Sequence, residues 1–110
     1  MQTIVELPEF RSRAEKLLTD REREGVINYL AVHPLAGVLI QGTGGIRKFR
    51  WASGTKGKSG GVRIIYYFHN ESIPLFLLSV FGKKEKANLT PAERNELAKV
   101  TKLIVKYYGE

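Results

Sequence analysis

Apolar and polar positions in the N-terminal quarter of the chain predict one short strand and two helices. Residues 2–7 predict the strand. Apolar residues then recur three and four positions apart, which is the helical period. Thr19 followed by Glu22 matches the capping box that begins a second helix. This helix is expected to end before Pro34, because a residue that precedes proline is disfavoured in helical conformation.

The rest of the chain contains three strand patterns and one helix pattern. Residues 37–45 follow, and within them the glycine-rich run at residues 41–45 predicts a loop. The predicted strands cover residues 46–52, 62–69 and 75–81. The third is almost continuously apolar, as in a strand that is covered on both faces. Residues 53–61 hold four glycines and no apolar side chain, so they are expected to connect two of these strands as a loop.

A closing helix is predicted from its first turn. Thr90 and Glu93 form a second capping-box pattern around Pro91, which suits the first helical position. The inner face of this helix is expected to carry Leu97, Val100, Ile104 and Tyr107. The element order β-α-α-β-β-β-α indicates the α+β class, with a small antiparallel-rich sheet packed against helices. Because no linker or repeat interrupts the pattern, residues 1–110 are expected to form one domain.

Positive charge is concentrated in the middle of the chain. The 110 residues include 18 Lys and Arg against 11 Asp and Glu, which gives a net charge of +7. Residues 46–86 hold nine of the basic residues and two of the acidic ones, so the excess lies there. A concentrated positive field suits a polyanion such as RNA, DNA or an acidic protein. The alternative is a solvated basic surface that serves solubility.

Strand alternation sorts these charges by face, since side chains two positions apart point the same way. Lys48 and Arg50 share one face of their strand, and Arg63 and Tyr67 share one face of the next. The opposite faces carry aromatic and apolar residues, namely Phe49, Trp51, Val62, Ile64, Tyr66 and Phe68. We expect helices to cover the apolar face, so that the three basic residues and the tyrosine converge on the other, concave face.

Further lysines lie in the loops at the edge of this predicted basic face. Lys83, Lys84 and Lys86 follow the last strand and add positive charge at its rim. Lys56 and Lys58 lie in the glycine-rich loop, where they either grip a phosphate backbone or form the tip of a disordered basic hairpin. A sheet normally shows charges on its solvent face. Charges of one sign, however, raise the free energy of the fold, so we expect them to have a use.

The composition excludes several classes of chemistry. The sequence has no cysteine, which excludes disulfides, thiolate zinc sites and cysteine nucleophiles. Asp, Glu and His form no cluster at ligand spacing, so neither a metal nor another cofactor is expected. His33 and His69 are isolated in the sequence and are expected to be structural or incidental. The longest apolar run has nine residues and no signal peptide is recognised, so we expect a soluble, cytoplasmic protein.

A basic site without a metal suits RNA cleavage, because the substrate supplies its own nucleophile, the 2′-hydroxyl group. The protein must hold this group in line with the leaving 5′-oxygen, stabilise charge on the phosphorane and move protons. Arginine suits the second task, since its planar guanidinium group pairs with two phosphate oxygens. Lys48 is the better candidate for the base, because neighbouring cations favour the neutral form of a lysine while arginine stays protonated.

Three runs of sequence resemble the HigB branch of the RelE/ParE toxin superfamily. They are residues 41–50 (QGTGGIRKFR), 60–67 (GGVRIIYY) and 82–86 (GKKEK), and residues 88–94 (NLTPAER) fit the same branch. The resemblance covers nearly the whole chain and implies the RelE-like fold. It implies the toxin of a type II toxin–antitoxin system, a ribosome-dependent endoribonuclease (mRNA interferase) that cuts messenger RNA in the ribosomal A site. It also implies a cognate helix-turn-helix antitoxin similar to HigA.

The resemblance further implies roles for individual residues. The positions that match catalytic ones are Lys48, Arg50, Arg63 and Lys84, with Arg63 stabilising the phosphate and Lys84 at a position where a general acid is proposed. The residues expected to contact RNA or the ribosome are Arg47, Lys56, Lys58, Tyr67, Lys83 and Lys86. The chain departs from its relatives at two places. Asn88-Leu89-Thr90 stands where some relatives have a tyrosine, and Arg50 stands where a lysine completes the strand pair.

Two other functions stay open at this point. A ParE-like toxin of the same fold would poison DNA gyrase and cut no RNA, but it has no need of three cations together on a concave face. A non-catalytic basic module that binds RNA or a ribosomal surface would tolerate Arg63→Lys, whereas an enzyme would lose its two-point pairing with phosphate. The fold alone does not decide among these functions, because one fold hosts several activities.

Overall fold

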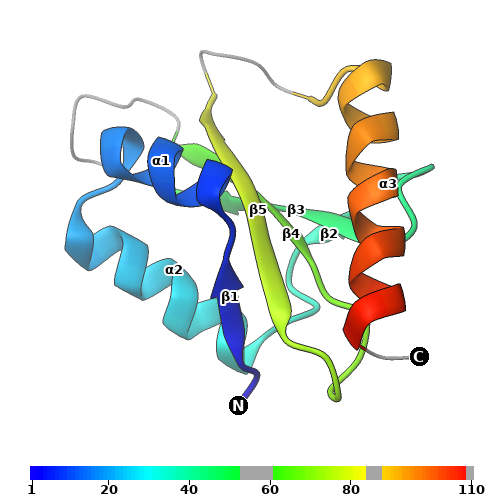
Figure 1. Ribbon diagram of the computed structural model, residues 1–110. Helices are drawn as coiled ribbons and strands as arrows, with labels where there is room; N and C mark the ends of the chain where they lie inside the picture. The colour runs from blue at the N-terminus through cyan, green and yellow to red at the C-terminus, as the bar shows by residue number, and fades with distance from the viewer. Residues whose placement is uncertain (53–60, 84–87, 109–110) are drawn as a thin grey trace.

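A mixed sheet lies at the centre of the computed structural model, which describes residues 1–52, 61–83 and 88–108 (Figure 1). Its strands are β1 (Ile4–Glu6), β2 (Val38–Leu39), β3 (Ile46–Trp51), β4 (Val62–Tyr67) and β5 (Leu75–Gly82). They lie in the order β1-β5-β4-β3-β2, with β1 parallel to β5 and the other pairs antiparallel. The helices are α1 (Pro8–Leu17), α2 (Asp20–Val32) and α3 (Pro91–Tyr108). These elements confirm the α+β class.

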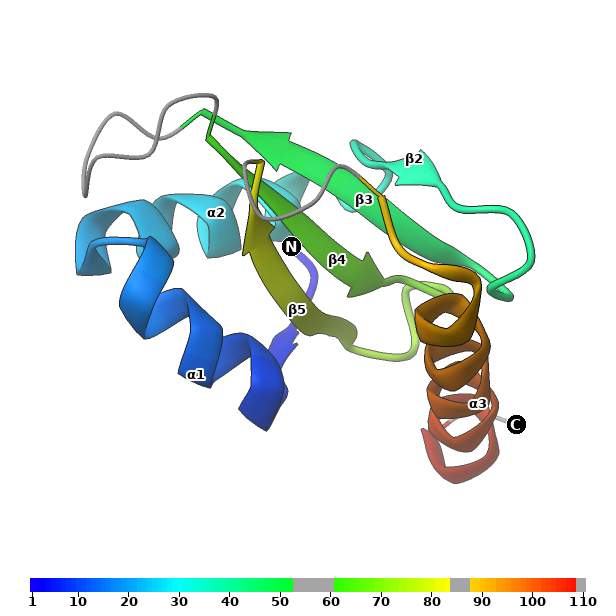
Figure 2. The ribbon, with the colours of Figure 1, turned by 90° about the horizontal axis from the view of Figure 1, so that it is seen from above.

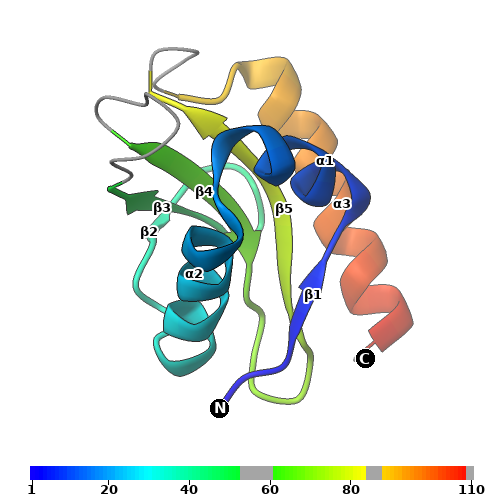
Figure 3. The ribbon, with the colours of Figure 1, turned by 90° about the vertical axis from the view of Figure 1, so that its left-hand side faces the viewer.

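The helices lie on both sides of the sheet. Figures 2 and 3 show α1 and α2 on one side and α3 on the other. The first side holds a core of Phe10, Ala14, Leu17, Leu18, Val26, Leu30, Val62, Ile64, Tyr66, Leu75, Leu77 and Val80. The second holds Ile46, Ile65, Tyr67, Ile73, Phe76, Leu78, Phe81 and Ile104. Every residue of β5 is buried between these cores, which confirms that this strand is covered on both faces.

Both predicted capping boxes are confirmed. In the first, the Glu22 amide donates to Thr19 Oγ1 at 3.1 Å, and the Thr19 amide donates to Glu22 Oε1 at 2.9 Å. In the second, the Glu93 amide donates to Thr90 Oγ1 at 3.1 Å, and the Thr90 amide donates to Glu93 Oε1 at 2.9 Å. Each box satisfies backbone donors that have no partner within the helix. The start of α3 is therefore fixed by the sequence immediately around it.

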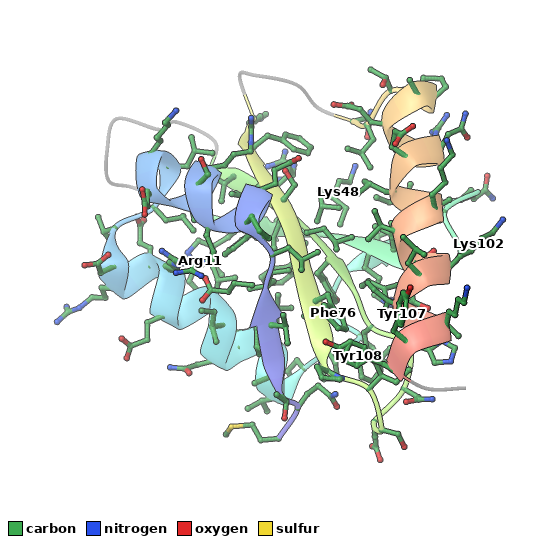
Figure 4. All side chains as sticks on the ribbon, viewed as in Figure 1. Arg11, Lys48, Phe76, Lys102, Tyr107 and Tyr108 are labelled. Atoms are coloured by element: carbon green, nitrogen blue, oxygen red, sulfur yellow. The ribbon has the colours of Figure 1, made fainter. Side chains whose placement is uncertain are left out.

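The structure departs from the predicted elements at two places. Val38–Leu39 forms an edge strand just before the predicted loop, where no element was predicted. Both of its residues are exposed, so no alternation of apolar and polar positions marks it. Tyr107 was expected on the inner face of α3 but is 75% exposed. The residue one turn after Ile104 that reaches the sheet is Tyr108 instead, whose ring lies 5.1 Å from that of Phe76 (Figure 4).

The hydroxyl group of Tyr66 fastens the segment between α2 and β2 to the sheet. It donates to the Pro34 carbonyl at 2.8 Å and accepts from the Gly37 amide at 2.9 Å. Tyr66→Phe is expected to lower the free energy of unfolding by about 1–3 kcal/mol, because the buried Gly37 amide loses its partner. Urea unfolding measures this change. Tyr107→Phe is the control, since that ring is exposed, and equal stability of the two variants would contradict the prediction.

Candidate active site

Three predicted site residues lie on the same face of the sheet. Arg50 is directly opposite Arg63 in the β3–β4 ladder, and Lys48 is opposite Ile65. Directly opposed residues share a face, with Cβ atoms about 4.5–5.5 Å apart. Lys48 lies two positions from Arg50 along β3, which corresponds to roughly 7 Å. The register thus brings Lys48, Arg50 and Arg63 together; we call these three residues the basic face.

The C-terminal helix covers only part of the side of the sheet that carries the basic face. Ile46, Tyr67 and Phe76 form one row across the sheet and belong to the core beneath α3. Arg50 and Arg63 lie four positions further along their strands, in the row that continues to Phe81. Arg50 is exposed and Arg63 is half-buried. The end of this side of the sheet that α3 covers therefore contributes to the core. The opposite end carries the positive charges of Arg50 and Arg63.

Lys48 lies between these two ends. It is half-buried, and Figure 4 shows its side chain in the space between the sheet and the N-terminal half of α3. Its Nζ atom donates a hydrogen bond to Asn88 Oδ1 at 2.7 Å. Asn88 was not predicted as a site residue. The signal for it in the sequence was its position just after the last cluster of lysines, residues 83–86.

The structure corrects the placement of Tyr67. Strand alternation puts its side chain on the expected side of the sheet, but α3 covers it there and leaves it 2% exposed. Its hydroxyl oxygen lies 3.2 Å from Nδ1 of His69, and the two rings are stacked with centroids 6.2 Å apart. Tyr67 is therefore part of the core and not of an open surface for RNA. His69 itself is exposed, and the expectation that it is structural or incidental stays a prediction.

The structure separates Arg47 from the basic face. Arg47 is opposite Tyr66 in the ladder, so it lies on the side of the sheet that α1 and α2 cover. Its Nη1 atom donates to the Gly37 carbonyl at 2.6 Å and to the Leu35 carbonyl at 3.3 Å. Arg47 thus fastens the segment before β2 and lies on the other side of the sheet from the basic face. Its expected contact with RNA or the ribosome stays a prediction.

The lysines predicted in the loops are described only in part. Lys83 is exposed directly after β5, and its amide donates to the Gly61 carbonyl at 3.3 Å. Gly82 is opposite Val62, so Lys83 lies at the end of the sheet to which Arg50 and Arg63 belong. Four predicted lysines lie outside the described residues: Lys56, Lys58, Lys84 and Lys86.

The pKa values of two buried tyrosines are raised above the ordinary value of 10.0. Burial raises the pKa of Tyr67; it also raises that of Tyr66, where the Gly37 hydrogen bond and Arg47 partly offset it. In the unfolded chain these groups ionise near pH 10, before they do so in the folded protein. Stability is therefore expected to fall as the pH rises from about 10 through the folded-state values. Thermal unfolding followed by circular dichroism from pH 8 to 11 measures this, and Tyr67→Phe should flatten the decline.

Among residues 1–52, 61–83 and 88–108, no three His, Asp or Glu side chains are grouped so that they could hold a metal ion. In the same part of the chain, no helix is long and apolar enough to cross a membrane. What the strand register assembles at the basic face is a set of three cations. Such a set can bind phosphate groups, and its lysine can transfer a proton.

A fold of this class with a basic sheet face agrees with the comparison to known families. Residues 31–110 match the family described as the RelE toxin of the RelE / RelB toxin-antitoxin system. The matched part includes the basic face and all of α3, together with β2 to β5. The chain belongs to the RelE toxin family and is the toxin of a toxin–antitoxin pair.

Proposed function

We propose that this protein is an mRNA interferase, an endoribonuclease that cuts messenger RNA on translating ribosomes and so inhibits translation. The observation that carries the proposal is the direct opposition of Arg50 and Arg63, with Lys48 on the same face. Directly opposed residues share a face of the sheet, so their two guanidinium groups can pair with oxygens of the same phosphate group. The membership of the RelE toxin family supports the same function.

The reaction needs no group from outside the protein and its substrate. The 2′-oxygen attacks the adjacent phosphorus atom and the bond from phosphorus to the 5′-oxygen breaks. The products are a 2′,3′-cyclic phosphate and a free 5′-hydroxyl group. One proton leaves the 2′-hydroxyl group and another must reach the 5′-oxygen. In this proposal Arg63 and Arg50 pair with the phosphate oxygens as charge develops on them.

Lys48 is the proposed base, because it can exist in a neutral form and the two arginines cannot. Its position beside the arginines supports this role, since proton transfer requires a group within hydrogen-bond reach of the 2′-hydroxyl group. The resemblance to HigB toxins proposes Lys84 as the acid that protonates the 5′-oxygen. Lys83, Lys86, Lys56 and Lys58 remain proposed contacts with RNA or the ribosome.

The proposed partners follow from this function. The ribosome and messenger RNA are the targets, in the cytoplasm, and the antitoxin is proposed to be a helix-turn-helix protein similar to HigA. A protein bound over the basic face would block it, and acidic side chains would suit that position by charge. No cofactor takes part in the proposed reaction.

Primer extension on a defined messenger RNA tests the proposal. The purified protein is incubated with the RNA in the presence and in the absence of translating ribosomes. Discrete cuts that require translation are expected. Cuts in free RNA would show a ribonuclease that does not depend on ribosomes. If the preparation stops cell growth but leaves the message intact, the proposed cleavage is wrong, and DNA gyrase becomes the next target to assay.

A further inference from the structure

A hydrogen bond joins two residues that lie forty positions apart on two different elements. Lys48 Nζ, on β3, donates to Asn88 Oδ1, just before α3, at 2.7 Å. An ammonium group can only donate hydrogen bonds, so the oxygen end of the amide must face Lys48. The lysine side chain, which has four rotatable bonds and would otherwise lose its direction in solvent, is thereby tied to a second point.

Two interactions fix the backbone next to Asn88. Two residues later, Thr90 forms the capping box with Glu93 that fixes the start of α3. Between them, the half-buried Leu89 packs against the core beneath α3. Asn88 is therefore presented by a short segment whose position two independent interactions determine. An acceptor on such a segment can hold the lysine in a defined direction.

We propose that Asn88 is a positioning residue that orients the Lys48 amine for proton transfer at the basic face. This inference rests on the proposed function, in which Lys48 acts on the 2′-hydroxyl group. Asn88 acts through the lysine, and it need not touch the reacting atoms.

A neutral acceptor suits this task better than a charged one. An aspartate would hold the lysine equally well, but its charge would favour the ammonium form and oppose the phosphate group that the arginines must bind. The asparagine side chain supplies direction without cancelling positive charge next to Arg50 and Arg63. The proposal thus explains why an amide, and not a carboxylate, meets the lysine at this position.

Single-turnover cleavage of a message on saturating programmed ribosomes tests the role of Asn88. Asn88→Ala is expected to slow cleavage about tenfold, because a misdirected base reduces the fraction of reactive geometries. The ribosome concentration that gives half-maximal rate should stay unchanged. Asn95→Ala is the matched control: it deletes the same amide from an exposed position on α3 and should cleave at the wild-type rate. Equal rates for Asn88→Ala and wild type would overturn the proposal.

Asn88→Asp separates positioning from a merely structural role. It keeps the acceptor, so much of the rate lost in Asn88→Ala should return. Its added charge should move the pH–rate profile to higher pH, because the lysine must lose its proton beside a carboxylate. A rate as low as that of Asn88→Ala at every pH, or an unshifted profile, would contradict the proposed role.

A measurement that does not depend on cleavage tells this proposal apart from the proposed function. In protein labelled with ¹³C and ¹⁵N lysine, the Lys48 side-chain resonances should shift in Asn88→Ala and stay in place in Asn95→Ala. If wild type cleaves but those resonances do not move in Asn88→Ala, the positioning role is wrong. If they move but wild type cuts no message, the proposed function fails, and the role of Asn88 in it fails with it.

Discussion

Arg63→Ala is expected to abolish cleavage of messenger RNA and the growth arrest that follows from it. The loss of a preorganised group that stabilises the transition state typically lowers the rate about 10²–10³-fold. Arg63 stands directly opposite Arg50, so removing it also removes one side of the proposed phosphate clamp. Lys48→Ala should be comparably inactive. The rate is measured under single-turnover conditions on programmed ribosomes, with growth of expressing cells as a second measure.

Arg63→Lys distinguishes a catalytic arginine from a charge that only attracts RNA. The lysine keeps the positive charge but cannot pair with two phosphate oxygens at once, so its cleavage rate is expected to lie close to that of Arg63→Ala. A module that only binds RNA would barely respond to this change. Arg11→Ala is the matched control, because Arg11 is exposed on α1, away from the basic face (Figure 4).

Circular dichroism must show that these variants are folded, since Arg63 is half-buried. A folded double variant, Lys48→Ala with Arg63→Ala, that remained fully toxic would refute the proposed site. Loss of activity in Arg11→Ala of the same size would show that net charge, and not the basic face, determines the activity.

Gly61→Ala is expected to be the most destabilising single substitution at the edge of the site. Gly61 has φ +75°, and a Cβ atom there would lie 2.3 Å from the Trp51 carbonyl oxygen and 3.0 Å from the Ala52 Cα atom. Both contacts are with backbone, which cannot rotate away. The positive φ adds about 1–3 kcal/mol of strain. The total loss should exceed about 3 kcal/mol, because the β3–β4 ladder must separate locally to relieve the clash.

Gly42→Ala separates strain from steric conflict. Gly42 has nearly the same angle, φ +78°, but a Cβ atom there meets nothing within 4 Å. This variant should lose only the strain of the positive φ, about 1–3 kcal/mol. Urea unfolding of both variants gives the comparison, and similar losses would mean that the clash at Gly61 is relaxed without cost. In Gly61→Ala, cleavage should also fall in the fraction that remains folded, because Gly61 directly precedes β4 and Arg63 is the second residue of that strand.

Local signals in the sequence were sufficient to predict most of the elements. Both capping boxes, at Thr19 and Thr90, involve residues three positions apart, so the sequence contains the whole interaction. The burial of β5 could be predicted because a strand between two cores has no polar side. The edge strand Val38–Leu39 could not be predicted, because two exposed residues show no alternation of apolar and polar positions. Its formation depends on pairing with β3, elsewhere in the chain.

The features of the candidate site that depend on strand alternation were predicted correctly. The features that depend on how α3 packs on the sheet were not. Alternation placed Lys48, Arg50 and Arg63 on one face, and the structure places them there. Alternation could not show that α3 would cover Tyr67 on that same side, because the position of a helix over a sheet depends on contacts across the whole chain. The contact between Lys48 and Asn88 was missed for the same reason.

The parallel pairing of β1 with β5 delays the completion of the sheet during synthesis. Ile4 pairs with Leu75, 71 positions later, and at ribosomal speeds of about 5–20 residues per second the second strand follows the first by roughly 4–14 s. Helices form in about a microsecond, so α1 and α2 wait for most of that interval with Phe10 and Leu30 uncovered. Since Asn88 comes after Leu75 in the chain, Lys48 meets Asn88 later still. A growing chain therefore carries the three cations of the basic face before the hydrogen bond between Lys48 and Asn88 can form.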